Sequence, residues 1–114
     1  MASVSVIIPA RNSEATLART LDSLRAQSIE HWEAIVVNDG SSDGTPAIAR
    51  EYAERDGRIR VITGAGKGVS AARNCGIAAA RCDWLVFLDA DDELRPDYLL
   101  EMCAGLEQRS ALLV

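Results

Sequence analysis

The chain has 114 residues, of which 48% are hydrophobic and 25% are charged. This balance is ordinary for a soluble globular domain, and the length suits one modest core, so we expect a single domain over residues 1–114. The net charge of −5 excludes nonspecific nucleic-acid binding, because such binding needs a basic surface that displaces counterions. No apolar stretch approaches the roughly 20 residues needed to cross a bilayer.

The number and spacing of the cysteines indicate the redox environment of the protein. The three cysteines are odd in number and show no C-x-x-C spacing: Cys75, Cys82 and Cys103. A disulfide framework or a zinc site is therefore not expected, and a reducing cytoplasm is the default location. The sequence leaves open a peripheral association with the inner face of a membrane.

Apolar runs predict short buried strands along the chain. Residues 4–8, VSVII, form a mostly apolar and β-branched run that Pro9 is expected to end, as for a strand buried on both faces. Similar runs predict strands at residues 34–37, 59–62 and 84–88, and the start of a fifth strand at 111–114.

Helices are predicted between these strands. Leu17, Leu21 and Leu24 recur at helical spacing after Ser13, a candidate cap. The next helix has its own start and stop signals and an inward stripe: Thr45 as cap, Pro46 in the first turn, Ile48 and Tyr52 facing inward, and Gly57 beyond the end. A third helix is expected over residues 70–81. Pro96 opens a fourth, with these side chains inward: Leu99, Leu100, Cys103 and Leu106.

This alternation predicts an α/β fold with a mostly parallel sheet and helices on both faces. In such sheets, ligands bind outside the carboxyl ends of the strands, where the strand order reverses. Polar clusters follow the four predicted strands, at residues 9–12, 38–41, 64–68 and 89–92. We therefore expect four strand ends to meet at one rim.

The acids that follow residues 84–88 predict a metal site. In the sequence Asp89-Ala90-Asp91-Asp92, the first and third side chains lie on one side of an extended backbone. Converging carboxylates repel one another, and a hard cation such as Mg²⁺ or Mn²⁺ relieves that repulsion while binding substrate phosphates. The alternative is that these acids are solvated and cap the next helix; three acids in four positions favour the metal.

Asp39 and the glycine-rich loop admit several interpretations. Asp39 either forms an Asp-Gly turn or accepts the ring N–H of a pyrimidine. An EF-hand loop starting there fails, because Arg50 occupies the position of the bidentate glutamate. Residues 64–68 lack the Lys-Ser/Thr pair of a P-loop. A dinucleotide-binding fingerprint should follow the first strand of the fold, whereas these residues follow the third. Lys67 and Arg73 nevertheless bring positive charge toward the acids, unless they are simply solvated.

Taken together, these segments resemble family 2 glycosyltransferases of the GT-A fold, in their nucleotide-sugar-binding half. The matching segments cover nearly the whole chain in order: VSVIIPARN at 4–12, TLDSLRAQS at 20–28, EAIVVNDGSSDGT at 33–45, GKGVSAARNCGIAAA at 66–80 and WLVFLDADDELRPDYL at 84–99.

The resemblance implies a nucleotide-diphospho-sugar donor, usually UDP-linked, a divalent metal, and inverting transfer to a saccharide or lipid-linked acceptor. It implies that Asp91 is the direct metal ligand and that Asp89 lies near the ribose or the metal. It also implies that the remaining site residues border the base and diphosphate: Pro9, Ala10, Arg11, Asp39, Gly66, Lys67, Gly68, Arg73, Asn74 and Ala90.

Two features depart from the family pattern. Asn38 stands where many members have a second aspartate. The family's second half, with the acceptor site and the general base, has no counterpart here, and no residue after Asp97 is an evident base.

Two alternatives follow. A catalytically incomplete nucleotide-binding or assembly module would pair with another copy through an exposed sheet edge. A phosphatase with an aspartyl nucleophile in D-x-D fits poorly, because the motif follows the fourth strand rather than the first.

Overall fold

The computed structural model describes the backbone of residues 3–113 and the side chains of residues 3–105. Strands and helices alternate along the chain in this order: β1 (Val4–Ala10), α1 (Leu17–Arg25), β2 (Trp32–Asn38), α2 (Thr45–Arg55), β3 (Ile59–Thr63), α3 (Val69–Ala79), β4 (Trp84–Phe87) and α4 (Tyr98–Leu113). The predicted α/β fold is confirmed.

The four strands form one sheet in the order β3-β2-β1-β4, and the three strand pairs are all parallel. β1 is therefore a central strand, which explains its almost unbroken run of buried residues. The chain first builds the sheet outward through β2 and β3. It then returns to the other side of β1 to add β4, so the strand order reverses between β1 and β4.

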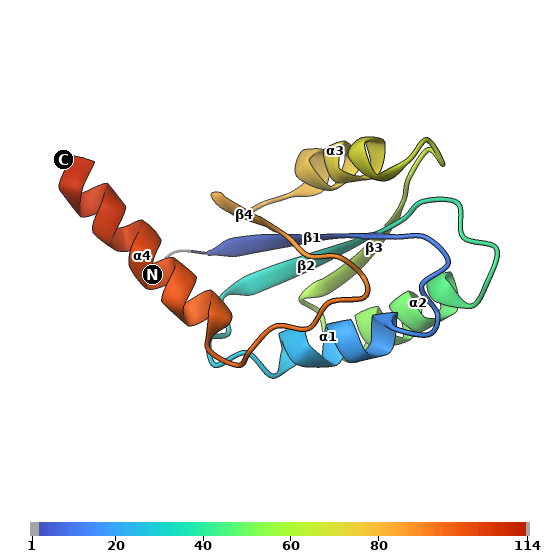
Figure 1. The fold of residues 1–114 in the computed structure, drawn as a ribbon, viewed down its shortest axis with the longest axis horizontal. Coiled ribbons are helices and arrows are strands. Elements are labelled where there is room, and N and C mark those ends of the chain that lie inside the picture. The colour runs from blue at the N-terminus through green and yellow to red at the C-terminus, as the bar shows by residue number, and fades with distance from the viewer. Residues whose placement is uncertain (1–2, 114) are drawn as a thin grey trace.

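Helices cover both faces of the sheet, as expected (Figure 1). The alternation of side chains along β1 divides its residues between the two faces. Val4, Val6 and Ile8 pack in the core beneath α1 and α2. Ile7 packs on the opposite face with Ala72 of α3.

α3 lies very close to the sheet because its facing residues are small. A Cβ atom placed on Gly76 would lie only 2.3 Å from Cγ2 of Ile7. This distance is shorter than any real contact, so glycine is required for α3 to approach β1 this closely.

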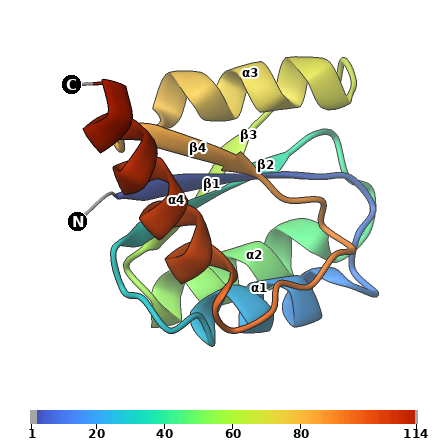
Figure 2. The same ribbon diagram turned by 60° about the vertical axis from the view of Figure 1, so that its left-hand side comes forward.

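The expected fifth strand is wrong. Residues 111–113 belong to α4, which runs without interruption from Tyr98 to Leu113. This stretch contains no proline and is rich in leucine, alanine, glutamate and other strong helix formers, so a short apolar run at its end continues the helix. Figures 1 and 2 place α4 at the end of the sheet where the strands begin.

The predicted inward face of α4 is correct in part. Leu99 and Cys103 are buried one turn apart, whereas Leu100 is 41% exposed. The expectation for Leu100 is therefore wrong, because it lies one residue beyond the buried stripe and points away from the core. The side chain of Leu106 lies outside the described residues.

The two predicted caps are also wrong in detail. Thr45 is the first helical residue of α2 rather than its cap, and an Asp43 carboxylate oxygen accepts the Thr45 N–H at 3.0 Å. At the start of α1, the backbone carbonyl of Ser13, not its side chain, accepts the N–H groups of Thr16 and Leu17. Pro46 and Gly57 lie where predicted, in the first turn of α2 and just beyond its end.

β4 is less covered than the sequence suggests. Trp84, Leu85 and Phe87 are each at least 36% exposed, and β4 is an edge strand that pairs with β1. In the part of the chain that the structure describes, no helix combines the length and apolar character needed to span a membrane.

Candidate functional site

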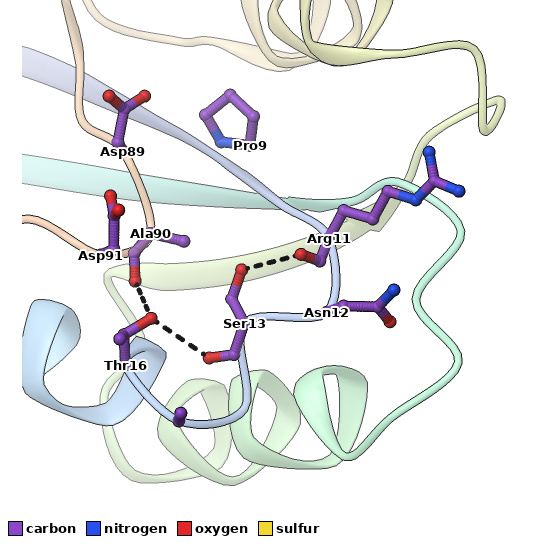
Figure 3. Close-up of a pocket in the computed structure, with 9 residues that line it drawn as sticks. Pro9, Arg11, Asn12, Ser13, Thr16, Asp89, Ala90 and Asp91 are labelled. Carbon is purple, nitrogen blue, oxygen red and sulfur yellow. Dashed lines mark hydrogen bonds between the residues drawn. The ribbon is translucent and has the colours of Figure 1, made fainter.

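A cavity of about 390 Å³ opens beside the carboxyl ends of β1 and β4, where the strand order reverses. This is the position at which parallel α/β sheets bind their ligands. The last part of β1 and the loops that follow these two strands line it, through Pro9, Arg11, Asn12, Ser13, Ala15, Thr16, Asp89, Ala90 and Asp91 (Figure 3).

Three carboxylates gather at the β4 side of this cavity. Asp89, Asp91 and Asp92 each offer an oxygen, and the three oxygens lie within 4.8 Å of one another. A tight turn brings them together, because the N–H of Asp92 donates to the carbonyl of Asp89 at 3.0 Å. All three are exposed, and carboxylate oxygens are the donors that Mg²⁺ and Mn²⁺ prefer. The residues present therefore fit a divalent ion.

Arg73 of α3 is the cation that the structure brings nearest to these acids. Its Nη2 lies 3.7 Å from Oδ1 of Asp89, which is an ion pair but too long for a hydrogen bond. The Nε atom of Arg73 is buried without a hydrogen-bond partner. The guanidinium also lies 5.7 Å from the centre of the Phe87 ring, within the range of a cation–π contact. Arg73 thus keeps donors that an anionic group at this rim is able to use.

Two threonine side chains hold the backbone between the two acids of the D-x-D sequence. The hydroxyls of Thr16 and Thr20 both donate to the carbonyl oxygen of Ala90, each at 2.9 Å. Figure 3 shows the Thr16 bond and shows Asp89 and Asp91 on either side of Ala90. The acids are therefore attached to α1 through one peptide group.

Asp39 and the glycine-rich loop form a second group beside this cavity. Asp39 follows β2 and is buried. Its two carboxylate oxygens accept the backbone N–H groups of Gly66 at 2.8 Å and Gly68 at 3.1 Å. Both glycines have positive φ, at 71° and 107°, a conformation that lets the loop turn its amides toward the carboxylate.

The loops that follow β1 and β2 are also braced against one another. The side-chain oxygen of Asn12 accepts the N–H of Ser42 at 2.8 Å, and the Ser41 hydroxyl accepts the N–H of Asn12 at 3.1 Å. Asn12 adopts a positive φ of 49°, which asparagine tolerates better than most residues. These bonds hold the rim of the cavity in a defined shape.

The structure brings together five of the residues expected at the site, which line one cavity: Pro9, Arg11, Asp89, Ala90 and Asp91. Ala10 is buried beside it, and its carbonyl accepts the N–H of Asp39. Lys67 and Asn74 are exposed and are not among the residues that line the cavity. Sequence reasoning did not assign Thr16 and Thr20 to the site; both look like ordinary positions at the start of a helix.

The fold defines an α/β domain of the GT-A type, with a cavity at the carboxyl ends of β1 and β4. The model of the family described as "Glycosyl transferase family 2" matches residues 5–114, and the chain belongs to that family. Membership weighs against the phosphatase interpretation and does not favour the alternative of a catalytically incomplete module.

Relatives and solved structures agree with this assignment. EpsJ of Bacillus subtilis, an uncharacterized glycosyltransferase, is 48% identical over 78% of this chain and 26% of its own length. The crystal structure of S. aureus TarS 1-349 in complex with UDP-GlcNAc has 28% identity and a TM-score of 0.83, over 93% of this chain and 31% of that one. The mannosyltransferase PcManGT from Pyrobaculum calidifontis, in complex with GDP-Man and Mn²⁺, has 28% identity and a TM-score of 0.75, over 81% and 28% of the two chains. The chain thus spans about a quarter to a third of the length of these three matched chains.

Proposed function

We propose that this chain binds a nucleotide-diphospho-sugar, UDP-linked, together with Mn²⁺ or Mg²⁺, for inverting transfer of the sugar to a saccharide or lipid-linked acceptor. The observation that supports this most strongly is the cluster of three acids at the cavity between β1 and β4. The TarS and PcManGT complexes, which contain nucleotide-sugars, support the donor class.

In this proposal Asp91 and Asp89 hold the metal. A bound divalent ion neutralises charge that develops on a diphosphate leaving group. Arg73 lies close enough to Asp89 to donate to an oxygen of the same diphosphate. Pro9 and Arg11 line the same cavity and are proposed to contact the nucleotide.

Asp39 is proposed to recognise the base. A carboxylate has about four acceptor positions, and the two amides of the glycine loop use two of them. The positions that remain are able to accept a ring N–H of uracil. The glycine loop, with Lys67, would then lie along the base and the diphosphate. We propose that Ala10 and Asn74 also lie beside this nucleotide.

Inverting transfer also requires a base that removes the proton of the acceptor hydroxyl. We assign this role to no residue of this chain. We also propose that the domain lies in the cytoplasm, where it would meet its nucleotide-sugar donor.

Equilibrium dialysis of this chain against a radiolabelled UDP-sugar tests the proposal. We expect retention with Mn²⁺, loss of retention with EDTA, and displacement by unlabelled UDP. Stronger displacement by GDP than by UDP would overturn the assignment of the base. Equal retention with Mn²⁺ and with EDTA would overturn the metal.

A further inference from the structure

A stripe of polar side chains on and beside α1 holds the segment that carries the acids. Thr16, Thr20, Ser23 and Gln27 recur every three or four residues, so they share one helix face. The Ser23 hydroxyl accepts the N–H of Leu94 at 3.1 Å. The Gln27 amide donates to the carbonyl of Arg95 at 2.7 Å and accepts the N–H of Leu99 at 3.0 Å. This stripe therefore fixes the chain from Ala90 to Leu99.

The two threonines act at the point closest to the acids. The last sheet bond before the turn joins the Leu88 N–H to the carbonyl of Ile7 at 3.0 Å. Beyond it, the Ala90 carbonyl oxygen accepts hydrogen bonds from both threonine hydroxyls. These two bonds occupy both lone pairs of that oxygen. The carbonyl shares a peptide plane with the amide of Asp91. Fixing this plane limits the directions in which the Asp89 and Asp91 side chains leave the turn.

We propose that Thr20, with Thr16, is a positioning residue that sets the spacing of the metal-binding acids through the carbonyl of Ala90. This inference rests on the proposed function. Thr20 is 1% exposed and does not line the cavity, so it has no route to the metal or the nucleotide except through Ala90. Thr16 lines the cavity as well, and for that reason Thr20 gives the cleaner test.

Removal of the Thr20 hydroxyl leaves the Ala90 carbonyl with one donor and frees the peptide to rotate. Three carboxylate oxygens within 4.8 Å form a metal site only while that spacing lasts. Groups that orient metal ligands change metal affinity by roughly 10- to 100-fold when they are removed. We expect Thr20→Val to weaken Mn²⁺ binding by about tenfold or more, and Thr20→Ser, which keeps the hydroxyl, to restore it.

The matched control is Ser23→Ala. It removes a hydroxyl from the same helix that also holds this segment. That hydroxyl bonds to the Leu94 N–H and to the backbone carbonyl of Thr20, not to Ala90 or the acids. Mn²⁺ dissociation constants, measured by titration with electron paramagnetic resonance, should be weakened in Thr20→Val and unchanged in Ser23→Ala. Equal Mn²⁺ affinity in Thr20→Val and the parent chain would overturn the inference, as would equal weakening in the two variants.

A measurement without metal separates this inference from the proposed function. The N–H of Asp92 closes the acidic turn on the carbonyl of Asp89, so its hydrogen exchange reports the order of the turn. Exchange at Asp92 should accelerate in Thr20→Val and in Thr16→Val, and not in Ser23→Ala. Unchanged exchange overturns the positioning role even if the metal binds. Failure of the parent chain to bind Mn²⁺ overturns the proposed function, while faster exchange would still support the anchor.

Discussion

The carboxylate of Asp39 accepts the backbone N–H of Gly66 at 2.8 Å, although the two residues follow different strands. The second oxygen of the same carboxylate accepts the N–H of Gly68. One buried side chain thus fixes the glycine loop that follows β3, and in our proposal it also meets the base. The shape of the loop and the recognition of the nucleotide therefore depend on the same charge.

Replacement of Asp39 by asparagine should loosen the glycine loop. The amide NH₂ would face a backbone N–H, donor against donor, and an unsatisfied buried polar group costs about 1–3 kcal/mol. We expect the free energy of unfolding in urea to fall by that amount and the hydrogen exchange of Gly66 and Gly68 to accelerate. Asp97→Asn, at an exposed position, is the control and should alter neither quantity. Unchanged exchange at both glycines would show that the carboxylate does not hold the loop.

Two glycines in helices should respond in opposite directions to the same substitution. Gly76→Ala introduces a Cβ atom 2.3 Å from Cγ2 of Ile7, and such overpacking typically costs about 1–3 kcal/mol. At Gly105 of α4, a Cβ atom meets nothing within 4 Å, so Gly105→Ala should be neutral or stabilise by up to about 1 kcal/mol. Thermal unfolding of the two variants compares them directly. A Gly76→Ala variant as stable as the parent would contradict the close approach of α3 to the sheet.

The sequence predicts the strands of this fold well because burial on both faces leaves an unmistakable apolar run, as in residues 4–8. The end of the chain shows where that reasoning fails. Residues 111–113 are apolar and were expected to form a strand, but they continue α4. A short apolar run is compatible with a helix or a strand, and only the residues before it decide between them.

The site was predictable to the extent that it depends on strand ends. The positions of Pro9, Asp89 and Asp91 follow from the rule that parallel strands share their carboxyl edge. The role of Thr20 was not predictable, because its partner is a backbone carbonyl 70 residues away in the sequence. No residue type indicates such a contact. The bonds between Asp39 and the glycine loop depend in the same way on tertiary structure.

The partly buried polar network around Glu33 should make stability fall at acid pH. Burial by itself would raise the pKa of Glu33, but hydrogen bonds from the Ser5 hydroxyl, the Arg81 N–H and the Arg60 guanidinium outweigh it and hold the pKa below its usual value of 4.5. A lowered pKa in the folded state stabilises the protein above the unfolded pKa, and this contribution is lost as the pH falls. Urea unfolding from pH 7 to pH 3 should therefore show a smaller acid-dependent loss in Glu33→Gln than in the parent. Parallel pH profiles for the two proteins would contradict this role.

Asp56 should act in the same direction over a lower pH range. Hydrogen bonds from the Arg58 side chain, against the opposing effect of burial, lower its pKa from 3.8 to about 2. Arg25 adds an ion pair at 3.4 Å. Stabilisation by this carboxylate, of at most about 2 kcal/mol, is complete above about pH 4 and is lost as the pH falls toward about 2. The difference in stability between the parent and Asp56→Asn should narrow over that range, and a constant difference would be inconsistent with the lowered pKa.

The central claim is that the acids after β4 hold a metal ion and, through it, a nucleoside diphosphate. Isothermal titration of UDP into the chain with Mn²⁺ tests it, with Asp91→Ala compared against Asp83→Ala. Both substitutions remove one exposed acid near an end of β4, but Asp83 precedes the strand and lies outside the acid cluster. The account predicts binding that requires Mn²⁺ in the parent and in Asp83→Ala, and affinity weakened by roughly tenfold or more in Asp91→Ala. Equal heats and equal affinities in Asp91→Ala and Asp83→Ala would contradict it.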